Sequence, residues 1–173
     1  MKLTTVLAVI GLAVVLQAAL ARYTVGGALV FDLVLVGVVY AAVQQGPAAG
    51  MMAGTLAGLL QDLLSGGIVG IGGLAKTVVG YVAGTVGAQF VLARPHVRAA
   101  LVAVGTVVHR ALVVAVLALI DQSWIGFPWT ATLVETAINS AAALVAFQVT
   151  DSLPGMVERR KASRRSTFSR RQW

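Results

Sequence analysis

Six ionisable side chains fall within or at the edge of long apolar stretches of this 173-residue chain. They are Asp32, Asp62, Lys76, Arg110, Glu135 and Asp151. Charge at membrane depth is costly, and one interpretation of it is an ion or substrate pathway. The other is structural, since polar groups can clasp packed helices together in one register. We favour clasps, because each deep acid has a base within reach, whereas a proton relay strings several acids or histidines together. The pathway stays open as the alternative.

The order of these residues predicts two acid–base pairs. Asp62 and Lys76 flank a Gly-rich turn at 65–73, so an antiparallel helical hairpin would bring them together. An ion pair between them would reduce the burial penalty of both. Arg110 and Glu135 lie at different depths on two later segments, but an arginine side chain is long enough to bridge them.

Nothing in the sequence indicates catalysis. The two histidines are His96, in a loop, and His109, which with Asn139 would extend the second pair. The glycines of Gly70–Gly73 suggest a phosphate loop but lack the Lys-Ser/Thr that follows them in such loops. Without cysteine, the chain has no disulfide, thiolate metal site or cysteine nucleophile. We predict no enzyme, and no catalytic, cofactor-binding or metal site.

The composition is that of a membrane protein. Hydrophobic residues make up 58 % of the chain, charged residues 11 %, and the mean hydropathy is +0.90; soluble domains carry about 25 % charged residues. Because a spanning helix needs about 20 residues, the length fits five or six helices and no separate soluble domain. The apolar pattern predicts six spans at about 3–21, 28–44, 48–64, 68–92, 99–120 and 130–150.

The first apolar run raises the question of a signal peptide, because Lys2 precedes it and Ala19–Ala21 fits a small-x-small cleavage site. The run is longer than the 7–15 residues usual for the core of a signal peptide. We therefore expect it to be retained as the first transmembrane helix.

Glycine recurs every four residues on two neighbouring spans, at Gly50, Gly54 and Gly58 and again at Gly80 and Gly84. In water such residues destabilise a helix by roughly 1 kcal/mol each, but a bilayer offers the backbone no alternative to helical hydrogen bonds. The missing side chains let two helices approach closely. We predict an all-α fold with a Gly-rich hairpin whose glycines pack internally or against a partner helix.

Lysine and arginine are unequally distributed between the two ends of the predicted spans. With the N-terminus inside, Lys2, Arg94, Arg98 and seven basic residues of the C-terminal tail lie in the cytoplasm, whereas Arg22 lies outside. This asymmetry favours six spans with both termini cytoplasmic.

The chain divides into a six-helix transmembrane domain at 1–155 and a basic tail at 156–173. The tail is rich in charge and poor in apolar residues, so we expect it to be disordered alone. Its basic residues predict contact with anionic lipid. No nucleic acid partner is expected, because nothing here resembles a fold that presents side chains to bases.

The segment between Gly54 and Gly84 resembles the family of rod shape-determining protein MreD. Members of that family commonly carry a G-x-x-x-G-L-x-x-D-x-x-x-G type run in the third span, then a Gly-rich turn and a G-Y-x-x-G start to the next stretch. The corresponding residues here are Gly54, Gly58, Leu59, Leu60, Gln61, Asp62, Ser65, Gly66, Gly70, Gly73, Leu74, Lys76, Gly80, Tyr81 and Gly84.

The resemblance implies a bacterial inner-membrane scaffold, without enzymatic activity, in the machinery for lateral peptidoglycan synthesis. It implies MreC as a partner, bound through its transmembrane helix, together with MreB, RodA and a class B penicillin-binding protein. It also implies a fold similar to the S components of energy-coupling factor transporters. That likeness leaves an alternative open, a small-molecule importer subunit with a ligand cavity near the outer surface, lined by Asp32, Trp124, Phe127, Trp129 or Glu135.

Overall fold

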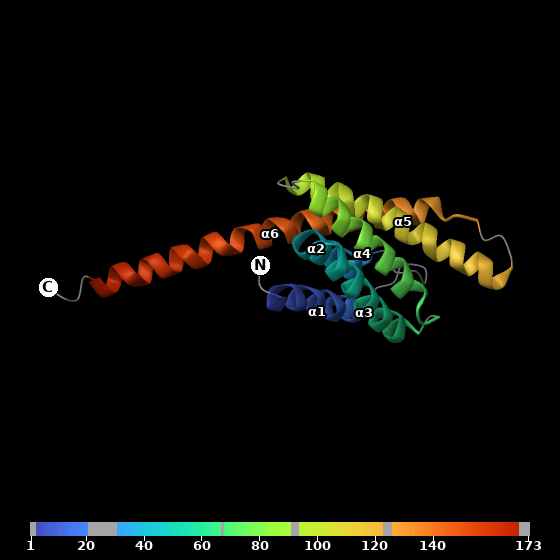
Figure 1. Cartoon of the computed structure of the whole chain (residues 1–173), viewed down its shortest axis with the longest axis horizontal. Helices are drawn as coiled ribbons and strands as arrows, with labels where there is room; N and C mark the ends of the chain where they lie inside the picture. Colours follow the sequence, from blue (N-terminus) through green and yellow to red (C-terminus); the bar gives the residue numbers. More distant parts are fainter. Residues whose placement is uncertain (1–2, 21–30, 67, 91–93, 123–125, 170–173) are drawn as a thin grey trace.

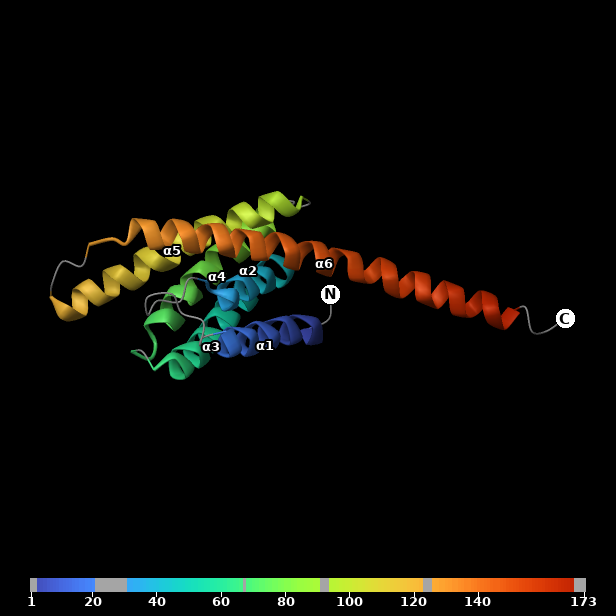
Figure 2. The ribbon, with the colours of Figure 1, turned by 180° about the vertical axis from the view of Figure 1, so that it is seen from behind.

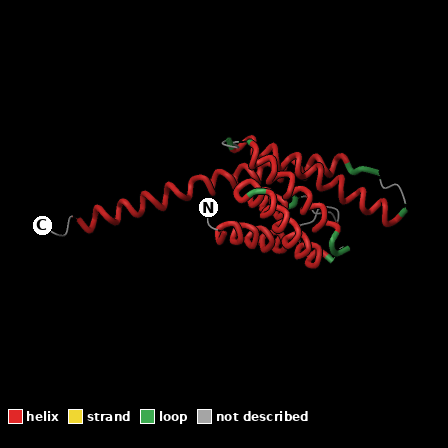
Figure 3. The backbone as a smooth tube through the Cα atoms, viewed as in Figure 1, coloured by secondary structure: helices red, strands yellow, loops and turns green. Residues whose placement is uncertain are grey.

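The protein is all-helical in the residues that its computed structural model describes, which are 3–20, 31–66, 68–90, 94–122 and 126–169 (Figure 3). Its six helices are α1 (Leu3–Leu20), α2 (Leu33–Gln45), α3 (Pro47–Ser65), α4 (Ile71–Gln89), α5 (Pro95–Asp121) and α6 (Trp129–Ser169). Side chains are described up to Thr150, apart from those of the first turn and of Val9 and Leu20. Predicted features at Lys2, Arg22, Trp124, Asp151 and in the tail therefore lie outside the described side chains.

Among the residues that the structure describes, three stretches are long and apolar enough to cross a membrane, namely Ile71–Gln89, Pro95–Asp121 and Trp129–Thr150. Two shorter apolar helical stretches are Ile10–Ala19 and Leu33–Gln45. The expectation of an all-helical fold with six helices is thus confirmed, whereas six membrane spans remain a prediction.

α2 is the central helix of the bundle. It contacts all five other helices, and every residue from Val34 to Ala42 is buried. Figures 1 and 2 show it in a middle layer with α4, between a layer of α1 and α3 and a layer of α5 and α6. Tyr40 packs on Phe147 of α6, with ring centroids 5.5 Å apart. The apolar core is therefore built around α2.

The predicted glycine ladders face each other across the α3–α4 hairpin. A Cβ atom on Gly54 would collide with the backbone carbonyl of Lys76, one on Gly50 with that of Gly80, and one on Gly84 with the backbone of Pro47. Gly54, Gly50 and Gly84 are all buried. The glycine ladders therefore allow α3 and α4 to pack closely on each other. This is the internal packing that the sequence predicts as one option, beside packing against a partner helix.

The α3–α4 turn depends on two glycines with left-handed backbone, Gly66 at φ 68° and Gly70 at φ 106°. Residues with a Cβ rarely adopt such angles. The Asp62 carboxylate accepts hydrogen bonds from the backbone N–H groups of Gly70 (2.9 Å) and Gly73 (3.1 Å). These bonds satisfy donors at the start of α4 that have no partner within the helix.

α6 continues well beyond the bundle (Figures 1 and 2). It passes the expected end of the transmembrane domain at residue 155 and includes most of the basic segment, up to Ser169. The boundary at 155 and the predicted disorder of the isolated tail stay predictions.

Candidate functional site

Asp32 joins three helices at one end of the bundle. As the N-cap of α2, it accepts the Leu35 N–H through Oδ1 at 2.9 Å. Its other oxygen, Oδ2, lies 2.7 Å from Nζ of Lys76 on α4. Its backbone N–H donates to Oδ1 of Asn139 on α6, at 2.8 Å. A short polar side chain before an apolar run is the usual N-cap signal. The sequence therefore contains a sign of the N-cap role of Asp32, which our predictions from the sequence did not use.

Lys76 is paired with Asp32 rather than with Asp62. Its side chain is 2 % exposed, and Nζ also lies 3.2 Å from Nε2 of His109. The expectation of an Asp62–Lys76 ion pair therefore needs correction. The physical reason is the register of the hairpin, in which Lys76 lies against Gly54 of α3, about two turns from Asp62. Asp32, by contrast, directs Oδ2 toward the Lys76 ammonium.

Arg110 of α5 and Glu135 of α6 contact each other through Nη2 and Oε2, as the sequence suggests. The Glu135 side chain is buried, and that of Arg110 is partly exposed. His109 and Asn139 do not extend this pair in the expected way. Asn139 donates through Nδ2 to Oγ1 of Thr106 at 3.2 Å, and His109 contacts Lys76.

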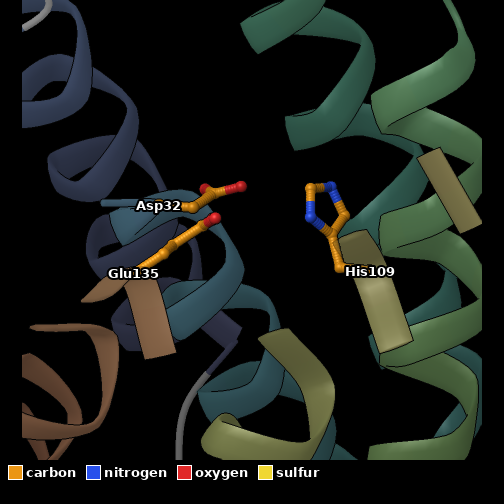
Figure 4. Close-up of side chains that lie close together, drawn as sticks. All are labelled: Asp32, His109 and Glu135. Carbon is orange, nitrogen blue, oxygen red and sulfur yellow. The ribbon is translucent and has the colours of Figure 1, made fainter. Parts of the chain in front are cut away.

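The two ion pairs form a single polar cluster. One ligand-type atom from each of Asp32, His109 and Glu135 lies within 4.8 Å of the other two. Figure 4 shows the Asp32 and Glu135 carboxyl groups next to each other and facing the His109 ring. The cluster therefore connects α2, α4, α5 and α6.

This trio has the donor types of a metal site, one imidazole and two carboxylates. However, the Lys76 ammonium already lies against Asp32 and His109, and Arg110 already lies against Glu135. A divalent cation would have to displace both positive side chains. The arrangement is therefore better suited to an internal ion-pair cluster than to a metal.

A cavity of about 320 Å³ adjoins the polar cluster, between α2, α3, α4, α5 and α6. Its polar lining consists of the cluster residues together with Gln61 and Asp62, and its apolar lining includes Phe31, Ile71 and Leu117. Asp32 and Glu135, two residues that the importer interpretation named, line it. Phe127 and Trp129 do not; their rings pack on each other with centroids 4.5 Å apart.

A second hollow is an apolar groove of about 140 Å³ that is lined by residues of α1, α2 and α6. Among its mostly large apolar lining residues are four small ones, Ala13 of α1, Gly37 of α2, and Ala142 and Ala146 of α6. Because α1 and α6 do not contact each other, the groove separates them.

Large apolar side chains cover the outer surface of the helices, and Leu119 is 80 % exposed. Exposed apolar surface on this scale, around a buried ion-pair cluster, defines the class as an integral membrane protein of packed helices. The sequence model of the rod shape-determining protein MreD family matches residues 1–150, and the chain therefore belongs to that family. This confirms the resemblance found in the sequence.

The family is one of membrane proteins with a role in rod shape determination, and it is not a known enzyme family. No curated protein and no solved structure matches the chain. Similarity to the S components of energy-coupling factor transporters accordingly remains a prediction.

Proposed function

We propose that this protein is a non-enzymatic scaffold of the bacterial cell-elongation machinery and that it binds the transmembrane helix of MreC. The observation that carries the proposal is the family match over residues 1–150. MreB, RodA and a class B penicillin-binding protein are further proposed partners. The protein would reside in the cytoplasmic membrane, with its basic C-terminal segment at anionic lipid headgroups.

The groove between α1 and α6 is the surface we assign to the partner helix. The glycine ladders of α3 and α4 pack against each other inside the hairpin, so they do not form a surface for a partner helix. The groove offers the half-buried Ala142 and Ala146 of α6, whereas the buried Gly37 and Ala13 already pack on each other. Small residues of this kind allow close approach of a second transmembrane helix.

The test is co-purification of the protein with MreC of the same organism in mild detergent. Ala146→Leu fills the groove, whereas Ala111→Leu makes the same change on an exposed position of α5 outside it. We expect the natural protein and Ala111→Leu to retain MreC and Ala146→Leu to lose most of it. If the folded natural protein fails to retain MreC, the scaffold proposal is wrong. If all three retain it equally, only the groove assignment is wrong.

The importer subunit remains a second candidate, because a cavity lined by Asp32 and Glu135 does exist. An importer subunit would associate with an energising ATPase complex and not with MreC. The same purification distinguishes the two functions by the partner that it recovers.

A further inference from the structure

Three buried polar atoms beside the 320 Å³ cavity have no hydrogen-bond partner among the described residues. They are Oε1 of Gln61, Nδ1 of His109 and Nε of Arg110, and all three residues line the cavity. His109 is 8 % exposed. Unpaired buried polar atoms are rare, because each one loses its bonds to water without gaining a partner in the protein. All three residues line one hollow, although Gln61 also borders another one beside Gln17 and Ser65, so a ligand that enters the first hollow can supply the missing partners.

The hydrogen-bonding needs of this ligand follow from the neighbours of the three atoms. The Lys76 ammonium has only donors, so Nε2 of His109 accepts from it and the ring proton resides on Nδ1. Nε of Arg110 is likewise a donor, because a guanidinium has no acceptor. The Gln61 Oε1 atom is an acceptor. The ligand must therefore accept two hydrogen bonds and donate one.

The charge balance of the cavity argues against an ionic ligand. Lys76 and Arg110 are already neutralised by contacts with Asp32 and Glu135, and the Asp62 carboxylate adds a further negative charge to the lining. An anion would meet three carboxylates. A cation would be drawn to the Asp62 carboxylate, which already accepts two backbone N–H groups at the start of α4, but it could not accept a hydrogen bond from His109 or Arg110.

Hydroxyl groups both donate and accept, so a cluster of them satisfies all three atoms without bringing charge. Phe31, Val113 and Leu117 add apolar lining beside these polar groups, as the face of a sugar ring or the glycerol end of a lipid requires. We propose that this cavity binds an uncharged, hydroxyl-rich sugar group, either as a lipid headgroup or as a free saccharide. The site does not depend on the scaffold function, since binding is a property of this chain alone.

The test uses native mass spectrometry of the whole purified protein in a polyoxyethylene detergent, which has no sugar headgroup. The probes are dioleoyl monoglucosylglycerol, dioleoylphosphatidylcholine as a lipid without hydroxyls in its headgroup, and methyl β-glucoside as the free sugar. We expect saturable binding of one glucolipid and none comparable for phosphatidylcholine. Competition by methyl β-glucoside would assign the site to a free saccharide, and its failure to compete would assign it to the lipid.

Two variants remove single hydrogen bonds at this cavity. Gln61→Leu deletes the acceptor, and Arg110→Lys keeps the positive charge beside Glu135 while deleting Nε. Each should weaken glucolipid binding about five- to tenfold. Gln89→Leu is the matched control, because Gln89 is exposed at the far end of α4. Equal binding of glucolipid and phosphatidylcholine, or equal glucolipid binding by Gln61→Leu, Arg110→Lys and Gln89→Leu when all are folded by circular dichroism, overturns the proposal.

Discussion

Lys76 and Asp32 are the residues on which the buried cluster depends most directly. Lys76→Met would leave the Asp32 carboxylate buried beside His109 without its cation. Removing one partner of a buried pair destabilises a fold by about 3–5 kcal/mol. We expect that loss in the free energy of unfolding, measured by denaturant titration in detergent.

The same experiment discriminates between the observed partner and the expected one. In a double-mutant cycle, Asp32→Asn and Lys76→Met should be strongly non-additive, with a coupling energy above about 1 kcal/mol. Asp62→Asn and Lys76→Met share no contact and should add within about 0.5 kcal/mol. The reverse pattern would restore the ion pair expected from the sequence.

Asp62 has a different task, to accept two backbone N–H groups at the start of α4. Asp62→Ala leaves both donors without their acceptor and should destabilise the protein by about 1–3 kcal/mol. Ser65→Ala is the control, because the exposed Ser65 hydroxyl only donates to the carbonyl of Gln61, one turn back. Equal unfolding midpoints for the two variants would contradict this role.

For individual residues, the sequence was a good guide to which charged side chains are buried. It was a poorer guide to which of them form ion pairs. Arg110 and Glu135 were expected to pair because one basic and one acidic residue lie on adjacent spans, and α5 and α6 are antiparallel neighbours. The partner of Lys76 depends on the register of the α3–α4 hairpin, which places Lys76 against Gly54 rather than against Asp62. That register is set by the close packing of the glycines together with the turn hydrogen bonds of Asp62, which the order of charges along the sequence does not encode.

At the scale of elements, the α3–α4 hairpin is the part most sensitive to added atoms. Gly54→Ala places a Cβ against the Lys76 carbonyl. The nearest atoms all belong to the backbone of Lys76 and Thr77, so no flexible side chain can move aside. We expect Gly54→Ala to reduce the yield of folded, monodisperse protein severalfold, because overpacking typically costs about 1–3 kcal/mol. Gly11→Ala on α1 is the control, since a Cβ there has nothing within 4 Å. Size-exclusion profiles of the two variants give the comparison, and equal yields would show that the hairpin can relax.

The helices themselves were largely readable from the sequence. Pro47 begins α3 as expected, because proline suits the first turn, where its missing N–H would have had no partner. The hairpin was recognisable from the four-residue spacing of Gly50, Gly54 and Gly58. The central position of α2 was not, because periodicity does not separate a helix buried all round by protein from one surrounded by lipid.

At the scale of the whole molecule, the asymmetry of basic residues and the position of the cavity make one joint prediction. Arg94, at the α4–α5 connection, belongs to the end that basic residues assign to the cytoplasm. The cavity lies at the opposite end, where Ile68 of the α3–α4 turn lines it. If both termini are cytoplasmic, the cavity and its polar cluster belong to the outer half of the membrane.

The absence of cysteine makes this directly measurable with a membrane-impermeant maleimide. Ile68→Cys and Phe90→Cys place single thiols at exposed positions, 56 % and 62 % exposed, at the two ends of α4. In spheroplasts we expect labelling of Ile68→Cys and protection of Phe90→Cys until the membrane is permeabilised. The opposite labelling pattern would show that the bundle has the reverse orientation in the membrane, with the cavity in the cytoplasmic half. A sugar-bearing ligand would then have to come from the inner leaflet or the cell interior, so the labelling result decides which pool of ligand the site can sample.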